Sequence, residues 1–118
     1  MTDIINTTPH PINFKGADGT EFEVPPCGTL ISARAVEEVV GTHPSGASLV
    51  HTRFESTPEA LAALAALEAD NPGVIIVGSI VAAQAFPGRV FGMTPAPGFE
   101  RVPIAEKRMD PVKFTTFG

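Results

Sequence analysis

The first quarter of the chain alternates between apolar and polar residues. Ile12-Asn13-Phe14 and Glu21-Phe22-Glu23-Val24 both show this alternation, and Ala17-Asp18-Gly19-Thr20 between them supplies an Asp-Gly turn. A period of two is typical of a half-buried strand, and Asp-Gly between two such runs favours a tight hairpin. We predict a β-hairpin over residues 11–24, preceded by a short strand at residues 3–6.

The sequence of residues 29–40 is compatible with either a helix or a strand. Leu30, Ala33, Val36 and Val40 lie at helical spacing, but residues 29–32 are equally compatible with a strand. We favour a strand over residues 29–36. A loop at residues 41–46 (GTHPSG) follows, and then a β-rich run that predicts a strand at residues 49–54.

The clearest helix is predicted over residues 57–69. Ser56-Thr57-Pro58-Glu59 has the Ser-x-x-Glu pattern of a capping box with proline in the first turn. Leu61, Leu64 and Leu67 form an apolar stripe among alanines, and Asn71-Pro72-Gly73 ends the helix.

A continuous apolar run, residues 74–77, then predicts a buried central strand. Ser79 is the expected N-cap of a second, short helix over residues 80–86. Prolines punctuate the remainder, where residues 89–91 and 112–117 are the best strand candidates. Together these patterns predict one domain, residues 1–118, of the α+β class, with a small mainly antiparallel β-sheet, an alanine-rich helix and a short helix.

Composition narrows the class of protein. The chain has 118 residues, of which 43% are hydrophobic, so we expect one domain with a radius of gyration of about 13–14 Å. It has neither an apolar run long enough to span a membrane nor a recognisable signal peptide. These two features predict a cytoplasmic protein that does not contact membranes. Its net charge of −5 disfavours binding to duplex nucleic acid.

No pattern of catalytic residues stands out. Cys27 is the only cysteine and has no base beside it in the sequence, and serine nucleophile motifs are absent. His10, His43 and His51 are not spaced like metal ligands. We therefore expect a protein that is not an enzyme, with no catalytic residue, no metal and no cofactor.

The strand–Gly78-Ser79–helix junction is a candidate anion site. The first amides of a helix lack intrahelical partners and, with the helix dipole, attract anions. Arg89 follows the helix and could hold a phosphate, as could Arg101 or Arg108. Phe91 or Phe99 could stack on a base. The alternative is a plain capped junction with surface arginines and core phenylalanines.

The opening residues 5–13 (INTTPHPIN) resemble the start of a family of small bacteriophage and prophage proteins. The likeness continues through Asp18-Gly19, through residues 25–28 (PPCG) and through residues 77–89 (VGSIVAAQAFPGR). It does not extend to the alanine-rich helix. The resemblance implies a phage accessory protein without an established enzyme activity, whose most distinctive element is Thr8-Pro9-His10. Two prolines there hold a rigid turn that could seat a ligand or cap the sheet.

Two functional hypotheses follow. In the first, the chain is a counter-defence protein that sequesters a host immune nucleotide, of the cyclic nucleotide or cyclic ADP-ribose type, in the host cytoplasm. Thr8, His10, Ser79 and Arg89 are then the candidate ligand-binding residues, and a homo-oligomer with sites at subunit boundaries is expected. In the second, it is a protein–protein interaction module, either an inhibitor of a host protein or a virion or assembly factor, that uses its short strand edges.

Overall fold

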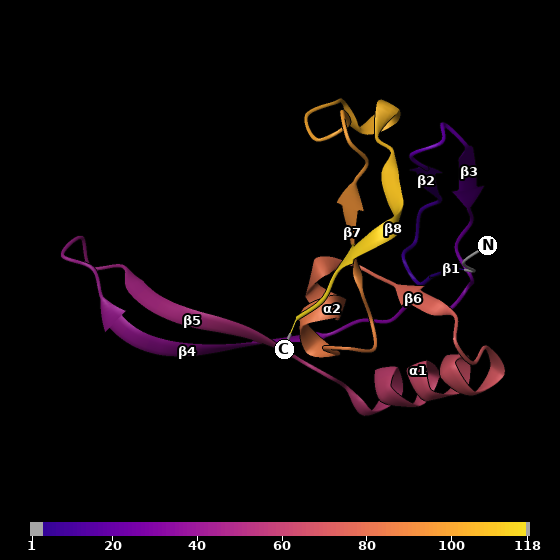
Figure 1. The fold of residues 1–118 in the computed structure, drawn as a ribbon. Coiled ribbons are helices and arrows are strands. Elements are labelled where there is room, and N and C mark those ends of the chain that lie inside the picture. Colours follow the sequence, from indigo (N-terminus) through magenta and orange to yellow (C-terminus); the bar gives the residue numbers. More distant parts are fainter. Residues whose placement is uncertain (1–3, 118) are drawn as a thin grey trace.

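The computed structural model of the chain describes residues 4–117 and has the predicted α+β fold (Figure 1). Eight strands form three sheets, and three of the five strand pairs are antiparallel. The strands are β1 (Ile4–Asn6), β2 (Ile12–Lys15), β3 (Glu21–Val24), β4 (Arg34–Thr42), β5 (Ser48–Glu55), β6 (Ile75–Val77), β7 (Gly92–Pro95) and β8 (Met109–Thr115). The helices are α1 (Pro58–Asp70), α2 (Ile80–Ala85) and a 3-10 turn, η1 (Ile104–Glu106).

The predicted hairpin is confirmed. β2 and β3 pair antiparallel with Phe14 opposite Phe22, and the two rings stack with centroids 5.3 Å apart. The four-stranded sheet that contains them has the order β3-β2-β8-β7, with β8 parallel to β2. Phe14 is fully buried, while the acidic residues of β3 are exposed, as the alternation predicts.

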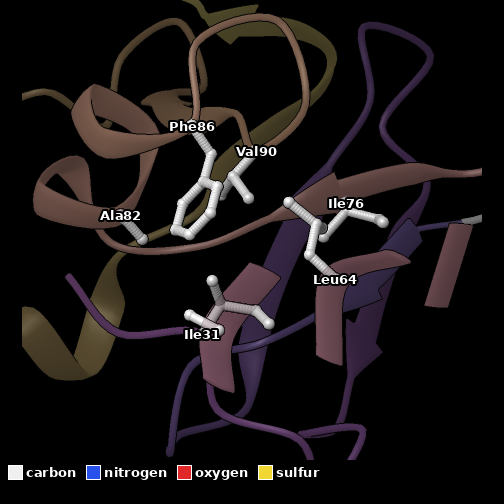
Figure 2. Packing of buried hydrophobic residues seen from close by; sticks show 7 residues of the cluster. Ile31, Leu64, Ile76, Ala82, Phe86 and Val90 are labelled. Carbon is white, nitrogen blue, oxygen red and sulfur yellow. The ribbon is translucent and has the colours of Figure 1, made fainter. Parts of the chain in front are cut away.

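The helices cover the short parallel pair of β1 and β6. The predicted apolar strand before Gly78 is β6, but it is less central than expected, because β1 and a bridge to Phe91 are its partners. Leu64 of α1, Ile76 of β6 and Phe86, which ends α2, pack together in the main apolar cluster (Figure 2). This cluster anchors the segment that runs from β6 into α2.

Helix α1 begins one residue later than its capping pattern suggests. Thr57, not Ser56, is the N-cap, and its side chain accepts a hydrogen bond from the Ala60 amide at 3.1 Å. The predicted leucine stripe is only partly buried: Leu64 is fully buried, but Leu61 is exposed. Steps of three residues fall short of a full helical turn, so such a stripe winds away from the core.

Three strand predictions are wrong in their bounds, and one of them is the strand expected over residues 112–117, which is β8 (Met109–Thr115). Residues 29–33 are irregular, and the strand that was expected over residues 29–36 begins at Arg34 and continues to Thr42. Ile31 is nevertheless buried, so its apolar character reflects core packing rather than a strand. In place of the strand expected at residues 89–91, residues 87–89 form a turn after α2, Phe91 makes an isolated bridge to Val77, and the strand β7 starts only at Gly92.

Strands β4 and β5 form a two-stranded ribbon that extends away from the rest of the protein (Figure 1). We call this ribbon the arm and the remainder the body. The radius of gyration is 16.6 Å and the principal extents are 52 × 35 × 23 Å. The radius exceeds the expected 13–14 Å because compact packing was assumed, whereas the arm projects from the body.

Among the described residues, the structure contains no helix with the length and apolar composition needed to cross a membrane.

Candidate functional site

The Thr8-Pro9-His10 turn is built around a buried asparagine. Asn6 is fully buried, and its amide nitrogen donates to the carbonyls of His10 at 2.7 Å and Val24 at 3.1 Å. Its side-chain oxygen accepts from the amide and the hydroxyl of Thr8, at 2.8 and 2.6 Å. All four hydrogen-bonding positions of the amide group are therefore used, which fixes the turn against β3.

The neighbouring Thr7 joins this turn to the junction before α2. Its amide and its hydroxyl both donate to the carbonyl of Val77, at 3.0 and 2.7 Å. A Cβ on Gly78 would lie 3.0 Å from the Thr7 hydroxyl and 2.9 Å from a methyl group of Val90. Glycine at position 78 therefore permits the close approach between the turn and the junction.

Ser79 is the N-cap of α2, as predicted, and its hydroxyl accepts from the Ala82 amide at 3.1 Å. It lies beside an open groove of about 270 Å³, which we call the turn groove. Its lining includes Thr8, Pro9, Leu30, Ala33, Ser79 and Val81. The fold thus brings together two of the four predicted ligand residues, Thr8 and Ser79, although they are 71 positions apart in sequence.

The other two candidates, His10 and Arg89, are not among the residues that line the turn groove. His10 is exposed at the end of the turn, where its carbonyl rather than its ring makes the hydrogen bonds that hold the turn.

The guanidinium of Arg89 makes a two-point contact with Glu68 of α1, at 2.6 and 3.2 Å. Hydrogen bonding to Arg89 lowers the pKa of the Glu68 carboxyl, and the same contact raises the pKa of Arg89. Arg89 therefore ties α1 to the turn that follows α2.

Three other candidate residues, Cys27, Arg108 and Phe99, do not line the turn groove. Cys27 is exposed, with a contact of 3.5 Å from its thiol to the Thr29 carbonyl. Of the candidate phosphate and base ligands, Arg108 pairs with Glu21 at 2.6 Å, and Phe99 lies under the ammonium group of Lys15.

Within residues 4–117 there is no cluster of three or more side chains of the kind that bind metal ions. His43 and His51 are both exposed and lie on the arm, one in its turn and one in β5.

The arm carries functional candidates that sequence reasoning missed. In its antiparallel register Ala35 lies opposite Phe54, Glu37 opposite Thr52 and Val39 opposite Val50, and these three pairs share one face because alternate residues of a strand point the same way. A β-bulge between Val39 and Gly41 adds Val40 beside them. Val39 is 67% and Val40 50% exposed. We call this face of the arm the valine face; its two valine positions are exposed, and Glu37 and Thr52 divide them from Ala35 and Phe54.

The opposite face of the arm is charged. Glu55 pairs with Arg34 across the strands at 3.1 Å and with Arg53 on its own strand at 3.0 Å. Hydrogen bonds from Arg53 and then Arg34 lower the pKa of the Glu55 carboxyl. Most of the charge lies on this face, although Val36 is also on it and Glu37 is on the valine face. The signal in the sequence was the pair of apolar runs that flank the GTHPSG turn, but the first run was assigned to a strand ending at residue 36.

No protein-family model, curated protein or solved structure matches this chain.

Proposed function

We propose that this chain is a non-enzymatic binding protein that holds a protein partner with the valine face of its arm. The observation that supports this is the group of exposed valines, Val39, Val40 and Val50, on a ribbon that extends away from the body. A two-stranded ribbon is marginally stable in water without further packing. Exposed apolar side chains that are grouped and bordered by polar residues, here Glu37 and Thr52, are typical of an interaction site.

The backbone of the arm favours a protein as partner. Within the described chain β4 and β5 pair only with each other, so each strand keeps an outer edge of main-chain donors and acceptors. Another polypeptide can satisfy such an edge by adding a strand or by packing across it. The open outer edges of β4 and β5 and the valine face therefore support the same kind of partner.

Site-specific photocrosslinking tests this function. A photoreactive side chain replaces Val39 on the arm or, as the control, Ile104 of η1, which is 90% exposed and off the arm. The cells that express the chain are irradiated, and adducts are identified by mass. A defined protein adduct from position 39 that is absent from position 104 supports the proposal. No adduct, or equal labelling from both positions, contradicts it.

A second candidate function is sequestration of a phosphorylated nucleotide in the turn groove, as in a phage counter-defence protein. It is supported by the juxtaposition of Thr8 and Ser79 on one groove beside the Asn6-centred turn. Its weakness is electrostatic, because the residues that line the groove include no cation and Arg89 is held by Glu68. A phosphate would normally be held by such a cation.

A thermal-shift screen with cyclic di- and trinucleotides and ADP-ribose derivatives tests this second function. A ligand at a hundred times its dissociation constant stabilises the folded state by about 2.7 kcal/mol. Ser79→Gly removes the hydroxyl while costing the helix cap only a few tenths of a kcal/mol. A shift that this variant abolishes supports nucleotide binding at the groove, and no shift across the panel contradicts it.

A further inference from the structure

We infer that His43 is a pH-dependent switch in the turn at the end of the arm, residues 43–47, which we call the arm turn. The neutral imidazole holds the arm turn by accepting a hydrogen bond from the Ser45 amide. Protonation of the ring breaks this bond and opens the turn. The inference goes beyond the proposed function and does not depend on which partner the arm binds.

Two backbone hydrogen bonds close the arm turn. The His43 amide donates to the Ala47 carbonyl and the Gly46 amide donates to the His43 carbonyl, both at 2.8 Å. Pro44 occupies the second position of the four-residue turn, where proline is favoured, and Gly46 follows with a φ of +94°. The amides of Ser45 and Ala47 are left to side-chain acceptors.

The His43 ring is the acceptor for the Ser45 amide. Its Nδ1 atom lies 3.1 Å from the Ser45 amide nitrogen and 2.9 Å from the Ser45 hydroxyl oxygen. A backbone amide can only donate, so Nδ1 must offer a lone pair, and the ring is therefore neutral with its proton on Nε2. The imidazole takes the role that an aspartate or asparagine side chain has at the first position of many turns.

Protonation turns this acceptor into a donor. Both nitrogens of an imidazolium carry hydrogen, so the Ser45 N–H would face a second N–H. The Ser45 hydroxyl can donate or accept, so its contact with the ring survives protonation. The amide contact does not survive, and the backbone at Ser45 must turn away from the ring. Histidine side chains undergo this change of charge between about pH 5 and 8.

His43 is the one titratable residue of the chain between Glu38 and His51, a segment that the structure describes throughout. Glu38 and His51 lie opposite each other in the arm, nearer to the body, and are the nearest titratable side chains along the two strands. Figure 1 shows the arm turn at the end of the arm that is farthest from the body. All five residues of the arm turn are exposed, so water reaches the ring.

NMR spectroscopy of the full chain labelled with nitrogen-15 tests the inference. At about pH 8 we expect Nδ1 of His43 to be unprotonated and to show a coupling to the Ser45 amide nitrogen across the hydrogen bond. At about pH 5 the coupling should vanish. The protection of the Ser45 amide from solvent exchange, relative to an unstructured peptide of the same sequence at the same pH, should fall about 2- to 10-fold.

Three variants separate the ring of His43 from other causes. His43→Asn keeps an acceptor that does not titrate, so the Ser45 amide should be protected at both pH values. His43→Ala removes the acceptor and should leave this amide unprotected at both. The matched control is His51→Asn, which removes the histidine of β5 and should leave the pH response of Ser45 unchanged.

Absence of the coupling at about pH 8 overturns the inference. So does equal protection of the Ser45 amide at the two pH values, a pH response that persists in His43→Asn, or one that is lost in His51→Asn. Photocrosslinking from position 39 is a separate measurement, so failure of the switch and failure of the proposed function are distinguishable.

Discussion

Replacement of Asn6 by aspartate tests whether the buried turn is held as described. The new side chain has the same shape, but an oxygen replaces the nitrogen that donates to the carbonyls of His10 and Val24. Two partly buried carbonyls lose their donor and face a second acceptor. An unsatisfied buried polar group costs about 1–3 kcal/mol, so we expect Asn6→Asp to lower the free energy of unfolding by about 3–5 kcal/mol at pH 7. With a melting entropy of about 0.25 kcal/mol/K for this length, the melting temperature falls by roughly 12–20 °C.

The loss should depend on pH. Burial favours the protonated form of the new carboxyl, so its folded-state pKa rises above the unfolded value of about 3.9. A raised pKa means that the destabilisation is small below about pH 3.9 and grows by about 1.4 kcal/mol per pH unit until the folded-state pKa is reached. Protonation also restores one hydrogen-bond donor. The variant should therefore recover part of its stability between pH 7 and pH 4.

Urea denaturation at both pH values measures the effect. The control is Gln84→Glu, the same change from amide to acid at an exposed position of α2, which we expect to stay within about 0.5 kcal/mol of the parent. A loss below 1 kcal/mol at pH 7 for Asn6→Asp, or a loss that does not change with pH, would refute the four-bond arrangement around Asn6.

Three further changes test the packing of the body. Leu64→Ala removes a fully buried side chain and should cost about 2–5 kcal/mol in urea denaturation, whereas Leu61→Ala on the same helix, at a 40% exposed position, should cost under 1 kcal/mol. Gly78→Ala places a Cβ 2.9 and 3.0 Å from two side chains and should lower the free energy of unfolding by about 1–3 kcal/mol. The control Gly41→Ala, with no atom within 4 Å of the added Cβ, should be nearly neutral. Equal losses of stability in the two variants would contradict the close approach at Gly78. Glu68→Gln should lower the free energy of unfolding by only about 0.5 kcal/mol at pH 7, because both side chains of the ion pair are 38% exposed. Since the pair lowers the pKa of the Glu68 carboxyl, its stabilisation is present above about pH 4.5 and is lost as the pH falls through the folded-state pKa. A difference in stability from the parent that persists at pH 2 would contradict this origin.

The sequence predicts best where local chemistry and tertiary packing agree. The β2–β3 hairpin follows from alternation and an Asp-Gly turn, and Ser79 caps α2 as its position before a helical run suggests. The shift of the α1 cap from Ser56 to Thr57 is a choice between two adjacent capping residues that the sequence pattern alone does not settle. Such elements are fixed by contacts within a few residues.

The candidate site depends on contacts that no local pattern contains. Thr8 and Ser79 were identified separately, but their shared groove arises because Thr7 binds the Val77 carbonyl across the parallel pair of β1 and β6. Arg89 was expected to be available to an anion, and its contact with Glu68 depends on how α1 packs. The arm was missed because an exposed valine strand looks, in sequence, like a strand that belongs to the core.

Hydrogen exchange of the arm tests the central claim most directly. An isolated two-stranded ribbon opens readily, so its amides should exchange quickly unless a partner covers it. We predict that residues 34–55 exchange rapidly in the purified chain, that the protein crosslinked at position 39 protects them when it is added, and that Val39→Lys with Val50→Lys abolishes this protection while the body keeps its own. Rapid exchange of the arm in the presence of that protein, or protection that survives these substitutions, would contradict the proposal that the valine face binds a protein partner.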